Sequence, residues 1–324
     1  MINLNPLVSI IILNWNGWQD TLECLESVFQ IDYPNYQVIL VDNNSQDQSL
    51  EKIRKYTQGK ITVKSPFFKY NPNNNPIKIT ELTKQETEQP TDNIKTTDNL
   101  LTLIKNDENY GFAAGNNIAI KYTLKAHDPD YILLLNNDTV VNPDFLTKLI
   151  QTTEKDPCLG ISGPLIYYYG VNGERDVVAN LGGKVNLGKY PGYYDLSEYH
   201  SLNDYSGELL ECDWVSGAAL LLKAKDLPIM LLNEDLSFGC EDIDLALNLK
   251  EYGYKSAVIL DSFIWHKEGV SRKKRSPERI NRALLEIRSN LTFLKAHKNH
   301  FYWYLPVYLF QIFVLYVKII IKRN

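Results

Sequence analysis

Residues 130–142 read DYILLLNNDTVVN, an apolar run that stops at a polar cluster. The run itself, residues 132–135, is typical of a strand buried on both faces, as the strands of a parallel sheet are. It ends abruptly at Asn136-Asn137-Asp138. Because ligands of open α/β sheets bind outside the carboxyl ends of the strands, this cluster indicates a binding site at the sheet edge.

The N-terminal region shows the same pattern twice more. Residues 8–13 and 37–41 are apolar runs that predict strands, and residues 20–29 and 47–56 have helical spacing. This alternation predicts a doubly wound α/β sheet. Further along we predict strands at 100–104, 131–135 and 255–260, an apolar segment at 214–222, short antiparallel strands and loops at 160–210, and helices that reach residue 126, span 143–153 and span 241–252.

Residues 59–99 interrupt this alternation. The stretch is rich in Asn, Thr, Gln, Lys and Pro and has few aliphatic residues. We therefore expect a low-complexity, partly disordered surface insertion within a domain at 1–270.

Composition limits the function. The 324 residues carry a formal net charge of −5, which argues against a nucleic-acid partner. The four cysteines show no C-x-x-C pair and no metal-ligand spacing, which favours a reducing cytosol. The N-terminus lacks a basic region and a cleavage site, so its apolar run is interpreted as a first strand and not as a signal peptide.

Three predicted strands end in short polar groups: Asn14-Trp15-Asn16, Asp42-Asn43-Asn44-Ser45 and Asn136-Asn137-Asp138. Each alone also suits a turn. Together they favour a nucleotide site, in which Asp138 offers an oxygen ligand to Mg²⁺ or Mn²⁺ and Asn136 and Asp42 contact ribose or base. The segment Asn14-Trp15-Asn16-Gly17 lacks the G-x-G-x-x-G spacing of a dehydrogenase, and no P-loop is present.

A second group of candidates lies later in the chain. Glu241 and Asp242 begin a predicted helix, where the dipole favours negative charge; they are either helix-capping acids or a general base. His266 follows a predicted strand and Trp265, and is either a packed residue or a ligand of the same metal as Asp138.

Seven motifs in order resemble those of the family 2 inverting glycosyltransferases: VSIIILNWNG, VILVDNNSQD, NYGFAAGNN, ILLLNNDTVV, DWVSGAALLL, EDIDLAL and the histidine of WHKEGVS. The rhamnosyltransferase-like and galactofuranosyltransferase-like branch is the most similar. The resemblance covers residues 6–272 apart from 59–99. It implies a GT-A fold, in which a Rossmann-like nucleotide half and an acceptor half share one mixed, mainly parallel sheet.

The resemblance also implies roles for individual residues. His266 matches a metal ligand, and Asn136-Asn137-Asp138 stands where the family has its D-x-D element, with Asn136 replacing the first aspartate. One metal carboxylate remains, so diphosphate oxygens would complete the shell of Mg²⁺ or Mn²⁺. The implied nucleotide-sugar site comprises Asn14, Trp15, Asn16, Asp42, Asn44, Gly111, Asn116, Asn136, Asn137 and Asp138.

Asp242 matches the catalytic base of the family, with Glu241 as its neighbour or substitute. A single displacement by the activated acceptor hydroxyl would invert the anomeric centre. The segment that resembles the part holding donor sugar and acceptor contains Asp213, Trp214, Ser216 and Gly217.

The last region, 271–324, is expected to be helical and membrane-associating. The basic stretch 271–275 suits a loop over the donor pyrophosphate, a solvated face or an anionic lipid surface. Residues 301–321 are long enough to cross a bilayer, but Pro306, Gln311 and Lys318 interrupt them, so an in-plane helix is favoured over a span or a core helix.

The sequence thus predicts a metal-dependent transferase at the inner face of the cytoplasmic membrane. Its donor would be dTDP-rhamnose or, second, a UDP-hexose, and its acceptor a glycan or a lipid-linked glycan in cell-surface polysaccharide synthesis. Two alternatives stay open: a non-catalytic sugar-nucleotide-binding or scaffold protein of the same fold, and a sugar nucleotidyltransferase.

Overall fold

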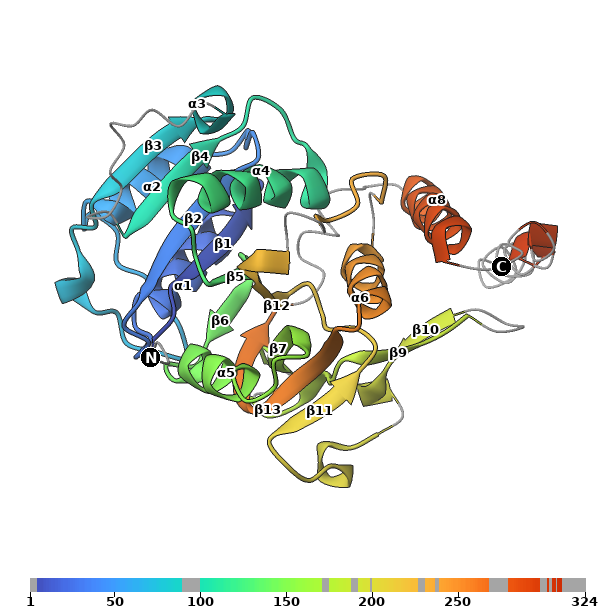
Figure 1. Ribbon diagram of the computed structural model, residues 1–324. Helices are drawn as coiled ribbons and strands as arrows, with labels where there is room; N and C mark the ends of the chain where they lie inside the picture. Colours follow the sequence, from blue (N-terminus) through green and yellow to red (C-terminus); the bar gives the residue numbers. More distant parts are fainter. Residues whose placement is uncertain are drawn as a thin grey trace, which may run out of the picture.

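The computed structural model describes residues 5–88, 100–170, 175–187, 192–198, 200–226, 231–236, 239–267 and 279–297, together with 302, 305, 306 and 308–310. In this part of the chain one large mixed sheet lies between two layers of helices, and a small hairpin lies beside it (Figure 1). The predicted α/β class is confirmed.

The large sheet has the order β11-β13-β7-β12-β5-β1-β2-β4-β3, with β6 paired to β13 and β8 paired to β7. Its strands are β1 (Val8–Asn14), β2 (Tyr36–Asp42), β3 (Ile79–Thr83), β4 (Leu101–Lys105), β5 (Tyr131–Asn136), β6 (Thr139–Val141), β7 (Leu159–Tyr168), β8 (Val178–Asn180), β11 (Leu209–Cys212), β12 (Ala219–Lys223) and β13 (Lys255–His266). The hairpin is formed by β9 (Gly183–Asn186) and β10 (Gly192–Asp195). The helices are α1 (Trp18–Val28), α2 (Ser49–Thr57), α3 (Lys84–Glu88), α4 (Gly111–Ala126), α5 (Phe145–Thr153), α6 (Glu241–Glu251) and α8 (Arg279–His297).

Strand register brings the predicted polar ends together. β1 is parallel to both β2 and β5, with Asn14 opposite Asp42 and Leu13 opposite Asn136. The three polar groups therefore emerge at one edge of the sheet, because parallel strands end on the same side.

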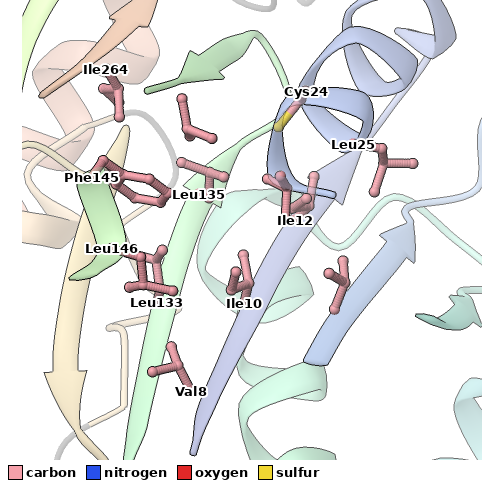
Figure 2. Packing of buried hydrophobic residues seen from close by; sticks show 14 of the residues in the cluster. Val8, Ile10, Ile12, Cys24, Leu25, Leu133, Leu135, Phe145, Leu146 and Ile264 are labelled. Carbon is pink, nitrogen blue, oxygen red and sulfur yellow. The ribbon is translucent and has the colours of Figure 1, made fainter. Parts of the chain in front are cut away.

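The strand side chains alternate between two cores. Figure 2 shows Val8, Ile10 and Ile12 of β1 beside Leu133 and Leu135 of β5, in the core that α1 and α5 cover. Ile11, Ile132 and Leu134 point to the opposite core, which residues of α4, α6 and α8 complete. This two-sided burial explains the continuous apolar runs, because every position of a central strand faces one core or the other.

The second half of the sheet is arranged around β12. This strand runs antiparallel to β5 on one side and to β7 on the other. The tight turn that leads into β12 therefore ends beside the carboxyl end of β5, close to the polar cluster.

Three expectations are corrected by the structure. The insertion expected at 59–99 contributes the edge strand β3, which pairs in parallel with β4; residues 89–99 lie outside the described residues. β13 extends through His266 instead of ending at Leu260. β7 is a ten-residue strand parallel to β13, where only short antiparallel strands were expected.

In the part of the chain that the structure describes, no helix combines the length and the apolar character needed to cross a membrane. Residues 268–278, which include the basic stretch 271–275, lie outside the described residues, as do 311–324 and much of 298–310.

Candidate functional site

The first cluster joins the ends of β1 and β2. The side-chain amide of Asn14 donates to the Asp42 carboxylate at 2.7 Å and to the Ser45 hydroxyl at 3.1 Å. The backbone nitrogen of Ser45 donates to the other Asp42 oxygen at 3.0 Å. Asp42 is 1% exposed, so its carboxylate is held in one orientation by these bonds. This is the place where a nucleotide base or ribose was predicted.

Asn137 extends the cluster across to α1. Its amide nitrogen lies 2.9 Å from the Thr21 hydroxyl, which in turn donates to the side-chain oxygen of Asn14 at 2.8 Å. A Cβ on Gly17 would lie only 2.9 Å from the same amide nitrogen, so a glycine is needed at this approach. Asn137 therefore supports the site and does not point freely into it.

The NYGFAAGNN motif has a packing role. The Asn43 amide donates to Asn109 at 2.9 Å and to the Gly111 carbonyl at 3.1 Å, and its oxygen accepts from the backbone nitrogen of Tyr110 at 3.2 Å. A Cβ on Gly115 would lie 2.9 Å from the Leu13 side chain, so Gly115 lets α4 pack against β1.

Asp138 and His266 form the predicted pair. Thr139 of β6 lies opposite His266 of β13, and this register places the imidazole Nε2 3.0 Å from the Asp138 carboxylate. The Asp138 side chain is 5% exposed. Burial alone raises the pKa of Asp138, but the hydrogen bond and charge of His266, with a contribution from Lys267, hold this pKa below its usual value.

Lys267, the residue after His266, is bonded to two carboxylates of α1. Its ammonium group donates to Asp20 at 2.7 Å and to Glu23 at 2.6 Å, both on α1. Burial would lower the pKa of Lys267, but these two carboxylates raise it above its usual value, so the group is a fixed cation. Sequence reasoning missed Lys267, although it directly follows His266.

Asp242 stands at the start of α6 and faces the turn before β12. One carboxylate oxygen accepts from the backbone nitrogen of Gly217 at 2.8 Å, and the other accepts from that of Ile243 at 2.9 Å. A Cβ on Gly217 would lie 3.5 Å from this carboxylate, so the turn approaches it closely. Asp242 is partly exposed, whereas Glu241 is 6% exposed, and this difference favours Asp242 as the base.

Asp138 and Asp242 are linked through a backbone hydrogen bond between β5 and the turn before β12. The nitrogen of Asn136 donates to the carbonyl of Ala218 at 2.9 Å, next to Gly217. Asp138 follows Asn136 by two residues, and Asp242 binds Gly217. The pairing of β5 with β12 therefore brings the candidate metal ligand and the candidate base to the same edge.

Two of the predicted site residues, Asp213 and Trp214, make contacts away from this cluster. The Asp213 carboxylate is bonded to Lys250 and to the backbone nitrogen of Val185. Lys250 lies eight residues along α6 from Asp242, which is about 12 Å of helix rise. The Trp214 ring packs against Gly183. The structure does not bring Asp213 into the cluster.

The remaining positions have local partners. The Asn116 amide donates to the backbone carbonyl of Phe112 within its own helix. The Ser216 hydroxyl accepts from the backbone nitrogen of Ala218. Asn16 and Asn44 have positive φ angles of 53° and 58°, a conformation that asparagine tolerates in turns. Trp15 is partly exposed beside them.

The donor set fits a divalent cation that shares its shell with phosphate. A carboxylate oxygen and an imidazole nitrogen suit Mn²⁺, and Mg²⁺ is commonly bound by one or two carboxylates with substrate phosphates. Among the described residues no three His, Cys, Asp or Glu side chains gather as a metal site. Asp138 and His266 would thus supply the protein's share of the ligands.

A protein-family comparison matches residues 9–75 and 83–208 to glycosyl transferase family 2, which is more than half of the chain. The fold, with one mixed, mainly parallel sheet between helices, is the GT-A fold of glycosyltransferases. The protein belongs to glycosyl transferase family 2.

Two curated relatives are similar over part of the chain. Rhamnosyltransferase WbbL of Escherichia coli is 27% identical over 162 residues, which are 45% of this chain and 56% of the relative. The uncharacterized protein y4gI of Sinorhizobium fredii is 25% identical over 187 residues, 55% of this chain and 19% of the relative. The matches therefore span less than two thirds of either relative.

Solved structures agree on the fold. GalNAc-T7 with UDP, GalNAc and Mn²⁺ aligns with a TM-score of 0.57 at 17% identity, over 89% of this chain and 48% of that one. The mannosyltransferase PcManGT of Pyrobaculum calidifontis, in complex with GDP-Man and Mn²⁺, aligns with a TM-score of 0.54 at 15% identity, over 95% of this chain and 70% of that one.

Proposed function

We propose that the protein is an inverting glycosyltransferase that moves rhamnose or a hexose from a nucleotide sugar to a hydroxyl group of a glycan or lipid-linked acceptor. One observation carries the proposal. The contact between Asn136 and Ala218 brings the Asp138–His266 pair and the Asp242 carboxylate to one sheet edge. A direct displacement requires a base and a site for the leaving diphosphate that both reach the region of one anomeric carbon, from its opposite sides.

Asp242 would act as the general base. The backbone nitrogens of Gly217 and Ile243 orient its carboxylate, and its partial exposure leaves it open to an acceptor hydroxyl. Asp242 takes the hydroxyl proton as the acceptor oxygen bonds to the anomeric carbon of the donor. The bond from that carbon to the nucleoside diphosphate breaks in the same displacement, which inverts the configuration.

Asp138 and His266 would hold Mg²⁺ or Mn²⁺ against the donor diphosphate. When bound, the cation supplies positive charge that offsets the charge on the departing phosphate. The Lys267 side chain is tied to α1, and its backbone nitrogen donates to the carbonyl of Asp138 at 3.0 Å, so the two ligands stay adjacent. The Mn²⁺ in the structures of GalNAc-T7 and PcManGT supports a divalent cation here.

The donor is proposed to be dTDP-rhamnose, with a UDP-hexose second. Similarity to a rhamnosyltransferase supports the first choice, and the UDP in the GalNAc-T7 structure supports the second. Asp42, held by Asn14 and Ser45, would accept a hydrogen bond from the base or ribose.

Calorimetry with UDP-, dTDP- and GDP-sugars, with and without Mn²⁺, tests the donor site. We expect one nucleotide to bind in a Mn²⁺-dependent manner, and Asp138→Ala to remove that dependence. Lys148→Ala, on a solvated ion pair with Asp144, is a control that should bind as the wild type does. Absence of binding by all three nucleotide classes would contradict the proposal.

A non-catalytic sugar-nucleotide-binding protein is the rival. It would bind the donor but leave it intact in the presence of acceptor glycans. Incubation of the bound donor with a panel of glycan acceptors, followed by detection of released nucleoside diphosphate, separates the two functions.

We also propose that the C-terminal residues hold the protein at the inner face of the cytoplasmic membrane. Tyr302 and Phe310 support this placement, because they are 75% and 65% exposed and bear large apolar rings. Deletion of residues 301–324 should shift the protein from the membrane fraction to the soluble fraction. An unchanged distribution would refute this placement.

A further inference from the structure

The first turn of α6 has no side-chain cap of its own. The residue before it, Cys240, has a φ of 72° and makes no capping hydrogen bond. The first backbone N–H groups of a helix have no partner within the helix, and a Ser, Thr, Asp or Asn cap usually fixes them. The Asp242 carboxylate accepts from one of these groups, that of Ile243, and contacts from α8 add to the support of the turn.

α8 contacts the C-terminal end of this turn, at Asp244. His297 Nε2 lies 2.7 Å from the carboxylate of Asp244, two residues after Asp242. The His297 and Asp244 side chains are 6% and 3% exposed, so the pair is shielded from water. The other Asp244 oxygen accepts from the Asn248 amide at 3.1 Å, which leaves both oxygens bonded.

α8 also contacts the N-terminal end of the turn, at Cys240. The Cys240 sulfur lies 3.4 Å from the side-chain oxygen of Asn290 and 3.3 Å from the Tyr193 hydroxyl of β10. Burial raises the pKa of this thiol to about 12, so it remains a neutral donor. Cys240 and Asp244 are one helical turn apart, and Glu241 and Asp242 lie between them.

The residues of α8 that make these contacts share one face. Asn290, Phe293 and His297 are spaced three and four residues apart, which places them on one side of a helix. Phe293 is 3% exposed, and its ring centre is 4.9 Å from that of His297 and 6.3 Å from that of Tyr193. Figure 1 shows α8 beside α6, on the side of the molecule away from β1 to β4.

We propose that α8 is a positioning element of the catalytic site, and that His297 and Asn290 are positioning residues for Asp242. The Asp244–His297 pair and the Cys240–Asn290 contact hold the first turn of α6 from both sides. The position of this turn determines the hydrogen bond between the Asp242 carboxylate and the backbone nitrogen of Gly217. The proposal rests on the proposed role of Asp242 as the base.

His297→Leu in the full-length protein removes the partner of Asp244 and keeps an apolar body in its place. His297→Gln retains a donor near the same position and should restore the wild-type behaviour. Lys295→Ala, on the exposed side of the same helix, is the matched control. Asn290→Ala tests the second contact and stands in if His297→Leu does not fold.

Two measurements apply to each variant. With the donor found by calorimetry, we expect His297→Leu to lower kcat by about tenfold or more while the donor KM changes by less than about twofold, because only the base is misplaced. By hydrogen exchange, the amides of Gly217 and Ile243 should exchange about tenfold faster, while those of β1 keep their protection.

Wild-type kcat together with wild-type protection of Gly217 and Ile243 in His297→Leu and Asn290→Ala would overturn the proposal. Equal loss of protection in β1 and at Gly217 would also overturn it, because it would show a purely structural role. If the wild type transfers no sugar at all, the proposed function fails. The exchange of the two amides that bond to Asp242 still tests the positioning by α8.

Discussion

Asparagine is the residue that organises the carboxyl edge of the sheet. Its amide donates and accepts at once, so Asn14, Asn43 and Asn137 each join several neighbours. The consequence is that Asp42 is held in one orientation by Asn14 and by the backbone of Ser45.

Gly183 gives a prediction at this scale. A Cβ there would lie 2.1 Å from the Trp214 ring, which is 8% exposed and cannot move aside. Gly183→Ala should lower the free energy of unfolding by about 2 kcal/mol through overpacking. Gly192→Ala in the same hairpin is the control, because nothing lies within 4 Å of its Cβ position. Urea denaturation that finds equal effects would contradict this packing.

At the scale of elements, the unexpected strand β3 is held by charge as well as by its ladder with β4. The Arg54 guanidinium makes two bonds of 2.7 Å to Glu81, and Lys105 lies 3.1 Å from the same carboxylate. Few apolar residues mark this strand in the sequence, and its main support comes from residues of α2 and β4. This is why pattern alone did not predict it.

The pKa of Glu81 gives the second prediction. The Arg54 hydrogen bond lowers it from an ordinary value of 4.5 to about 2. A lowered pKa stabilises the fold above the ordinary value and loses that effect as pH falls through the folded value. The Arg54 side chain is 42% exposed, so screening limits the contribution to about 1 kcal/mol.

Glu81→Gln should therefore be less stable than the wild type by this amount at pH 7. The difference should shrink between pH 4.5 and pH 2. Thermal unfolding across this range, with Arg54→Gln and the double variant, measures the pair directly. A difference that persists at pH 2 would show that Glu81 acts through packing.

At the scale of the whole molecule, the site divides between two parts of one sheet. The Asn14–Asp42 cluster lies on the parallel strands β1 and β2, whereas Asp242 lies on α6 and is bonded to the turn before β12. The end of β5 lies between the two groups, because Asn137 is bonded to Asn14 and Asn136 is bonded to the turn before β12. Donor binding and proton transfer are thus expected to be separable.

This separation gives the third prediction. Asp242→Asn should leave the Kd of the nucleotide donor unchanged and lower kcat by about 10³-fold, the loss expected for a general base. Asp42→Asn should weaken nucleotide binding and leave the kcat at saturating donor near that of the wild type. Calorimetry and turnover on both variants measure these effects, and loss of nucleotide binding in Asp242→Asn would contradict the division.

Sequence pattern sufficed where one local rule governed the outcome. The alternation of apolar runs and helical spacing predicted β1, α1, β2 and α2, because two-sided burial leaves a continuous apolar signal. Asp138 and His266, predicted to bind one metal ion, lie together in the structure, with Nε2 3.0 Å from the carboxylate. The roles of these residues stay predictions.

The sequence by itself determined the α/β class and the polar strand ends, because burial and turn chemistry act over a few neighbouring residues. The family was indicated by the resemblance of its motifs. Only the tertiary structure decided which polar residues meet. Asp213 shares a motif with Gly217 but is bonded to Lys250, whereas Lys267 and His297 reach their carboxylates from 244 and 53 residues away in sequence. Such pairings depend on strand register and helix packing, and no local pattern of residues encodes them.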